Sequence, residues 1–142
     1  MQVRELMTER VISVGQDEPV TAAARLLKRH NIGALPVCDS SGRLRGLVTD
    51  RDIVLRCVAM GEDPQTTRTG EIMSRGILTA EPDDSVDRAV RVMAQDQVRR
   101  LPVLDNGRLV GMVSLCDMAR NRDCDMEAAE ALTEISANIK RR

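Results

Sequence analysis

Apolar residues recur every three or four positions in two stretches of the chain, residues 19–30 and 85–96. They occupy Val20, Ala23, Ala24 and Leu27 in the first stretch, and Val86, Ala89, Val90 and Met93 in the second. This spacing predicts two amphipathic helices, because residues three and four apart share one face of an α-helix. Acidic residues just before each stretch are typical of helix starts.

Short apolar runs surround each of these helices and predict strands. The runs lie at 11–14, 34–39 and 43–50, and again at 77–80, 100–105 and 108–115. In each set the last two runs are separated by a few turn-forming residues, which predicts a hairpin. A further helix is expected after each hairpin, over 50–60 and 116–121.

The same order of elements therefore occurs twice, and the residues repeat with it. VRELMTERVISV (3–14) aligns with TGEIMSRGILTA (69–80) at an offset of 66 positions, which holds as far as Asp39 and Asp105. One residue is then lost in the hairpin turn, and an offset of 65 pairs Gly46 with Gly111. Turns tolerate such deletions, so the pattern indicates a tandem duplication of a β-α-β-β-α unit.

We divide the chain into repeat 1 (1–60), a linker (61–68), repeat 2 (69–122) and a helical tail (123–142). A single unit of this size buries too little apolar surface to be comfortably stable. We therefore expect an α/β (α+β) fold in which the two repeats pack sheet to sheet with pseudo-twofold symmetry. The tail is expected to form one further helix, with an apolar face made of Met126, Ala129, Leu132, Ile135 and Ile139.

Composition and charge argue against several classes of function. The 142 residues carry a net charge of −1, which gives no overall attraction to polyanions. The chain has no Phe, Tyr or Trp, the side chains on which single-stranded nucleic acids usually stack. No apolar run approaches the roughly 18 residues that span a bilayer, and the N-terminus lacks a signal-peptide core. We expect a cytoplasmic protein that binds neither nucleic acid nor membrane.

Metal binding and catalysis find little support in the residue pattern. The four cysteines form no CxxC pair and His30 is the one histidine, whereas zinc ligands usually occur in closely spaced pairs. The sequence shows no recognisable pattern of nucleophile and carboxylate residues that would form a catalytic group with His30. Neither a Gly-rich phosphate loop nor a GxSxG motif is present. We expect reduced cysteines, no metal site and no enzymatic activity.

Each hairpin ends on a hydroxyl residue that is followed three positions later by an aspartate. These pairs are Thr49 with Asp52, and Ser114 with Asp117. A carboxylate at this place could accept hydrogen bonds from two ribose hydroxyls, and the hydroxyl could donate to a phosphate. The same residue types are also good helix caps, and duplication copies a cap as faithfully as a site, so both interpretations stay open.

Two adjacent arginines distinguish the repeats. Arg99 and Arg100 stand where repeat 1 has Gly33 and Ala34. Neighbouring residues of a strand point to opposite faces, so at most one arginine enters a given cleft unless the strand end is irregular. The pair is either a solvated surface feature or a phosphate contact. In the second case the two clefts are not equivalent.

The duplicated element order, the Leu-Pro-Val strands at 35–37 and 101–103, and the two hydroxyl-aspartate endings together resemble a tandem pair of CBS (cystathionine-β-synthase) domains, a Bateman module. The resemblance covers residues 3 to about 121, and the chain is similar to the small stand-alone CBS-pair proteins of bacteria. It implies a non-catalytic regulatory module that binds an adenosyl compound (AMP, ADP, ATP or S-adenosylmethionine) in clefts between the repeats. It implies no obligatory cofactor.

The resemblance also implies roles for individual residues. Asp52 and Asp117 would hold ribose, Thr49 and Ser114 would lie near ribose or phosphate, and Arg99 and Arg100 would contact phosphate. The segments entering the first strands would line the base pocket, with Thr8, Val11, Ile12, Ser74, Ile77 and Leu78. Such modules commonly form homodimers, so the alternative is a structural homodimer or adaptor with vestigial clefts. In either case an unidentified protein partner could bind the module and respond to its state.

Overall fold

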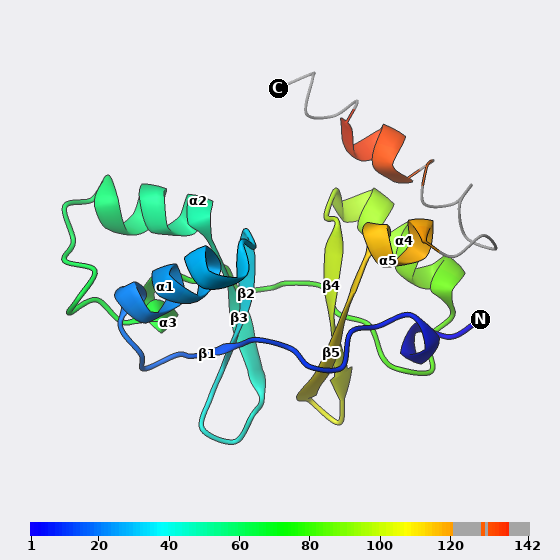
Figure 1. Cartoon of the computed structure of the whole chain (residues 1–142), viewed down its shortest axis with the longest axis horizontal. Helices are drawn as coiled ribbons and strands as arrows, with labels where there is room; N and C mark the ends of the chain where they lie inside the picture. The colour runs from blue at the N-terminus through cyan, green and yellow to red at the C-terminus, as the bar shows by residue number, and fades with distance from the viewer. Residues whose placement is uncertain (121–128, 130, 137–142) are drawn as a thin grey trace. The chain divides into compact units, whose positions relative to one another are not determined.

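The computed structural model describes residues 1–120, 129 and 131–136 (Figure 1). The chain divides into two compact units, each of which draws on both repeats. Unit 1 comprises Met1–Val11, Leu78–Asn106 and Val110–Arg142, and unit 2 comprises Ile12–Ile77 and Gly107–Leu109. In the described part of the chain, no helix is long and apolar enough to cross a membrane.

Unit 2 is a three-stranded sheet with its helices packed against it (Figure 1). Its elements are β1 (Val14–Gly15), α1 (Val20–His30), β2 (Ala34–Cys38), β3 (Leu44–Thr49), α2 (Asp50–Ile53), the π-helical turn η2 (Val54–Val58) and α3 (Thr69–Ile72). The strand order is β1-β2-β3, with β1 parallel and β3 antiparallel to β2. The apolar face of α1 packs on the strands, as the helical periodicity predicts, because Val20, Ala23 and Leu27 are buried with Leu35 and Val37.

The extra residue of the first hairpin is accommodated by a break in the strand pairing. Val37 pairs with Gly46 but Cys38 pairs with Leu44, which leaves Arg45 bulged out of the ladder. The guanidinium of Arg45 lies 3.0 Å from the carboxylate of Asp39. Backbone amides of the turn also donate to this carboxylate, and with Arg45 they lower the pKa of Asp39.

Unit 1 is built around the second hairpin (Figure 1). Its elements are the 3-10 turn η1 (Val3–Glu5), α4 (Val86–Asp96), β4 (Arg100–Asp105), β5 (Arg108–Ser114) and α5 (Leu115–Ala119). Met93, Leu101 and Val113 are fully or almost fully buried in its core. The helical segment 131–136 joins the same core through Ala131 and Ile135.

The first segment of each repeat belongs to the unit that contains the other repeat's hairpin. Thr8 pairs with Met112 on β5 through amide-to-carbonyl bonds of 2.8 and 3.0 Å. Ser74 pairs in the same way with Leu47 on β3, at 2.7 and 3.0 Å. These close approaches require glycine in the strand, because a Cβ on Gly46 would lie 2.5 Å from the carbonyl oxygen of Ser74.

The predicted helices and hairpins are confirmed, with two corrections to the strands and one to the tail. The strand expected over 11–14 is only Val14–Gly15, and the one expected over 77–80 is wrong, since Ala80 forms a single parallel bridge to Val103. In the tail, Ile135 of the predicted apolar face is buried, whereas Ala129 and Leu132 of that face are exposed. Ala131, which the prediction did not include, is buried. Met126 and Ile139 lie outside the described residues. The sheet-to-sheet packing of the repeats stays a prediction.

Candidate ligand-binding site

Both hydroxyl-aspartate pairs form capping boxes at the start of a short helix. The amide of Asp52 donates to Thr49 Oγ1 at 3.0 Å, and the amide of Thr49 donates to Asp52 Oδ2 at 3.0 Å. Ser114 and Asp117 make the same two bonds, at 3.1 and 2.9 Å. The capping interpretation is therefore confirmed, and each cap uses one oxygen of its carboxylate while the second oxygen, Oδ1, takes no part in it.

The carboxylate of Asp52 has further partners within unit 2. Ser74 Oγ lies 3.1 Å from Oδ1 and 3.2 Å from Oδ2 of Asp52 and donates its one hydrogen to them. Arg56 Nη1 lies 3.8 Å from Oδ1 and donates to the carbonyls of Ile72 and Met73. Asp52 is consequently buried, with 7% of its surface exposed.

The carboxylate of Asp117 has fewer partners within unit 1. Its Oδ1 accepts no hydrogen bond from any described residue, and Arg120 Nη1 lies 3.8 Å away. Thr8, the repeat counterpart of Ser74, is exposed. Because one oxygen of Asp117 keeps its acceptor capacity, this carboxylate can accept a hydrogen bond from the hydroxyl group of a ligand.

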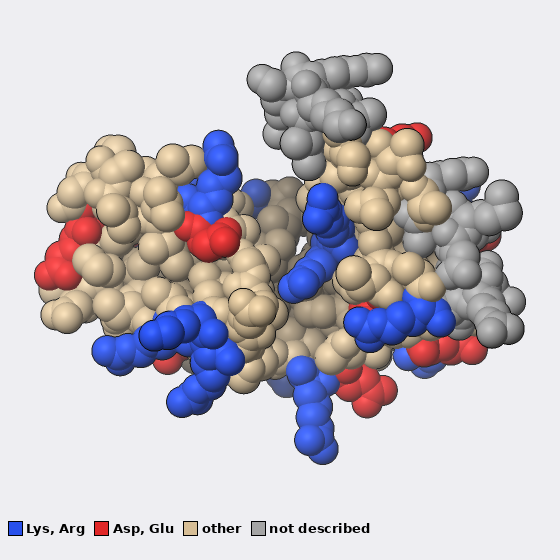
Figure 2. All heavy atoms as spheres, turned by 45° about the horizontal axis from the view of Figure 1, so that its top comes forward, with Lys and Arg blue, Asp and Glu red and all other residues tan. Residues whose placement is uncertain are grey.

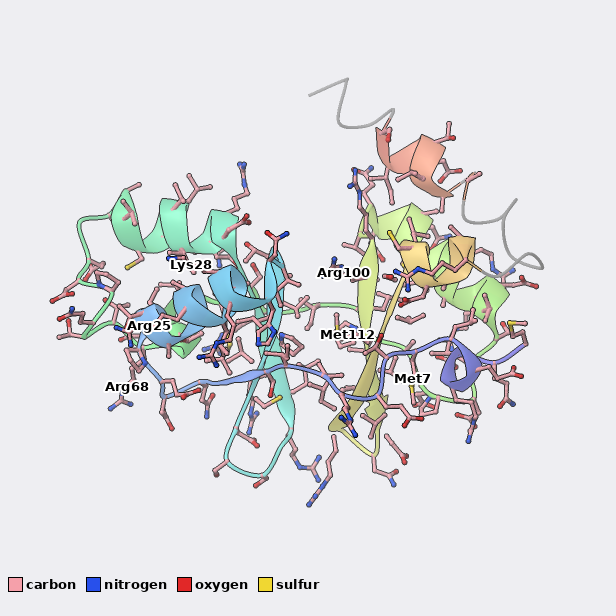
Figure 3. The ribbon with its side chains drawn as sticks, in the orientation of Figure 1. Met7, Arg25, Lys28, Arg68, Arg100 and Met112 are labelled. Carbon is pink, nitrogen blue, oxygen red and sulfur yellow. The ribbon has the colours of Figure 1, made fainter. Side chains whose placement is uncertain are left out.

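The arginine pair lies beside the Asp117 cap. The amide of Leu115 in α5 donates to the carbonyl of Arg99 at 3.0 Å, which holds the Arg99 backbone against the first turn of the helix. Arg100 begins β4 and extends from it (Figure 3). Both side chains are exposed, and neither forms an ion pair with a described residue. The backbone of Arg99 is thus bonded to the helix that carries Asp117, and neither arginine side chain is paired with a described acidic residue.

The equivalent place in unit 2 carries negative charge. The amide of Asp50 donates to the carbonyl of Gly33, the counterpart of Arg99, at 3.2 Å. A Cβ on Gly33 would lie 3.9 Å from both carboxylate oxygens of Asp50. Unit 1 has the neutral Leu115 in place of Asp50. On the face drawn in Figure 2, basic side chains lie in several separate groups, and some of these groups have acidic side chains beside them.

The twelve candidate residues are divided between the two compact units. Unit 1 contains Thr8, Val11, Leu78, Arg99, Arg100, Ser114 and Asp117. Unit 2 contains Ile12, Thr49, Asp52, Ser74 and Ile77. Asp117 thus shares its unit with Thr8 and Val11 of repeat 1, and Asp52 shares its unit with Ser74 and Ile77 of repeat 2. Ile12 and Leu78 are in a different unit from the other candidates of their own entry segments. Sequence reasoning missed Arg56 and Arg120, although their i,i+4 and i,i+3 spacing from Asp52 and Asp117 is a usable signal.

Comparison with known proteins agrees with this architecture. The CBS domain family matches residues 3–58 and 70–123, which is most of the chain. The chain therefore belongs to the CBS domain family. It is 44% identical over 134 residues to the CBS domain-containing protein YhcV of Bacillus subtilis, with 94% of each chain covered.

Two solved structures are similar to this fold. The Hypoxic Response Protein I, with two coordinated zinc ions, has a TM-score of 0.79 and 42% identity, covering 85% of this chain and 98% of the other. The CBS domain pair of protein MJ0100, in complex with 5′-methylthioadenosine and S-adenosylmethionine, has a TM-score of 0.73 and 30% identity, covering 84% and 94%. Among the residues described for the present chain, no group of three or more His, Cys, Asp or Glu could hold a metal ion.

Proposed function

We propose that the chain is a non-catalytic regulatory module that binds an adenosyl compound beside Asp117. The observation that carries this proposal is that Oδ1 of Asp117 accepts no hydrogen bond from a described residue, on a helix whose first turn is bonded to the backbone of Arg99. The bound 5′-methylthioadenosine and S-adenosylmethionine of the similar CBS pair support the choice of ligand class.

The chemistry of such a ligand matches the groups present. A ribose offers two neighbouring hydroxyl donors, which suit a carboxylate that has free acceptor positions. A guanidinium binds phosphate oxygens through charge-assisted hydrogen bonds, so Arg99 or Arg100 would favour AMP, ADP or ATP over an uncharged nucleoside. The chain's own contribution is to hold Asp117 in place through its bonds with Ser114.

Isothermal titration calorimetry of the unsubstituted chain tests the proposal. AMP, ATP, S-adenosylmethionine and 5′-methylthioadenosine are titrated separately. We expect saturable binding of at least one of them. If none of the four compounds gives a heat of binding, and equilibrium dialysis also detects no binding, the proposal of an adenosyl ligand is wrong.

Replacing the arginines separates their roles. Arg99→Gln and Arg100→Gln keep the length and polarity of the side chain but remove its charge. Replacing the arginine that contacts phosphate is expected to lower AMP affinity by about tenfold. A charge-assisted hydrogen bond contributes roughly 1.5 kcal/mol or more. The affinity for 5′-methylthioadenosine, which has no phosphate, should change by less than about twofold. Equal losses for the two ligands would show that neither arginine reads phosphate.

A second candidate function, a structural homodimer, is favoured by one apolar surface in unit 2. Four large apolar side chains in and after η2 are exposed: Val54 at 54%, Leu55 at 47%, Val58 at 63% and Met60 at 69%. Scattered apolar residues need no partner, but adjacent ones on one helical segment indicate an interface.

Charge next to this apolar surface favours a second copy of the chain as its partner. The exposed Arg51 precedes the apolar residues, the exposed Arg56 lies among them, and the exposed Glu62 and Asp63 follow them. In an antiparallel twofold pairing the basic end of one copy meets the acidic end of the other, so the surface is self-complementary. We propose that the chain forms a homodimer here, whether or not a ligand binds.

The substitution Val58→Glu tests the dimer. A carboxylate in the centre of an apolar interface loses its hydration without a partner, so we expect dimer affinity to fall at least about tenfold. Sedimentation velocity measures the mass. The control is Val98→Glu in unit 1, at a side chain 36% exposed, which should leave the dimer intact. A monomeric parent chain, or a dimer insensitive to Val58→Glu, would contradict this interface.

A further inference from the structure

The two equivalent carboxylates differ in how the opposite repeat's entry segment meets them. In unit 2 the hydroxyl of Ser74 reaches both oxygens of Asp52, at 3.1 and 3.2 Å. In unit 1 Thr8 occupies the repeat-equivalent position, is exposed and makes no hydrogen bond to Asp117. The difference separates two sites that the sequence repeat makes equivalent.

The carboxylate of Asp52 therefore accepts two hydrogens within the chain, one more than the carboxylate of Asp117. Its Oδ2 accepts from the Thr49 amide and from Ser74, while its Oδ1 accepts from Ser74 and faces Arg56 at 3.8 Å. A carboxylate has about four lone-pair positions. A ribose at Asp52 would compete with the Ser74 hydroxyl, which reaches both carboxylate oxygens, whereas at Asp117 no hydroxyl of a described residue competes for Oδ1.

The backbone of Ser74 cannot easily withdraw to make room. Ser74 exchanges both amide-to-carbonyl bonds with Leu47, at 2.7 and 3.0 Å. Arg56 holds the two preceding residues, because its Nη1 donates to the carbonyls of Ile72 and Met73 at 3.1 Å. Asp52, Leu47 and Arg56 thus fix the segment in three places, and Ile72 and Met73 are buried.

Local charge acts in the same direction. Asp50 lies beside Gly33, so a phosphate at this place would meet a second carboxylate instead of an arginine. Like charges at close range repel, and more strongly where water is excluded.

We infer that Ser74 closes the Asp52 site and thereby sets the ligand stoichiometry of the chain at one adenosyl molecule, bound at Asp117. This inference rests on the proposed function for its ligand, but it concerns a different residue and a different unit. It makes Ser74 a specificity-determining residue, which selects between two sites of common origin.

The test is the stoichiometry of 5′-methylthioadenosine binding, measured by titration calorimetry on the full chain. This probe carries no phosphate, so Asp50 does not repel it. The unsubstituted chain should bind one equivalent and Ser74→Ala two. The matched control Ser40→Ala removes an exposed turn hydroxyl and should still bind one. A stoichiometry that Ser74→Ala leaves unchanged, whatever its value, overturns the inference.

The failure of the proposed function would look different. If Asp117 binds no adenosyl ligand, the unsubstituted chain binds none, but Ser74→Ala still gains one equivalent when the closure is correct. Should Ser74→Ala fail to fold, nuclear magnetic resonance titration of the unsubstituted chain replaces it. The amide signals of Ser114 and Asp117 should then shift with 5′-methylthioadenosine, and those of Thr49 and Asp52 should not. Shifts at Thr49 and Asp52 overturn the inference.

Discussion

Gly46→Ala is expected to lower the free energy of unfolding by about 3 kcal/mol, the upper part of the usual range for overpacking a core. The added Cβ would lie 2.5 Å from the carbonyl oxygen of Ser74 and 2.9 Å from Met73 Sδ. The Met73 side chain can turn away. The Ser74 carbonyl cannot, because it accepts the amide of Leu47 in the pairing that joins the two segments.

Urea denaturation followed by circular dichroism measures this effect. The matched control is Gly33→Ala, whose new Cβ would find its nearest atoms, the carboxylate oxygens of Asp50, at 3.9 Å. That change should stay within about 0.5 kcal/mol. Gly111→Ala should fall between the two, since its Cβ would lie 3.0 Å from the Thr8 carbonyl. Equal stabilities of Gly46→Ala and Gly33→Ala would contradict the close approach of Ser74 to β3.

Asp117→Asn is expected to weaken the binding of an adenosyl ligand by at least about 100-fold. Two ribose hydroxyls would lose a charged acceptor, and each such bond contributes roughly 1.5–3 kcal/mol. The asparagine keeps a carbonyl oxygen that can accept the Ser114 amide, so the helix cap survives better than it would in Asp117→Ala.

Titration calorimetry of Asp117→Asn, with the best-binding adenosyl compound, provides the measurement. Asp87→Asn is the matched control, because it removes the same charge from an exposed position in α4 of the same unit. It should bind within about twofold of the unsubstituted chain. Normal affinity in Asp117→Asn would show that the carboxylate does not hold the ligand.

The duplicated pattern predicts most of the local structure correctly. Helical spacing places α1 and α4 to within a residue, because their burial depends on neighbouring positions of the same segment. The one-residue difference between the hairpins appears in the structure as the bulge at Arg45. The strand expected at 77–80 fails because only Ala80 reaches a partner strand, while Leu78 is 45% exposed.

The arrangement of the site is only partly readable from the sequence. The caps at Thr49 and Ser114 follow from residue type and a spacing of three, which is local chemistry. The bond from Ser74 to Asp52 joins residues 22 positions apart, and no local pattern reports it. Gly46 and Gly111, equivalent glycines within strands, are the available signal that another backbone passes close by.

A crystal structure of the chain grown with 5′-methylthioadenosine shows which of the two carboxylates holds the ribose. We expect one ligand per chain, with both ribose hydroxyls within about 2.6–3.2 Å of the Asp117 carboxylate and no ligand at Asp52. Density for the ribose at Asp52 alone, or none at Asp117 in crystals soaked well above the dissociation constant, would contradict this expectation.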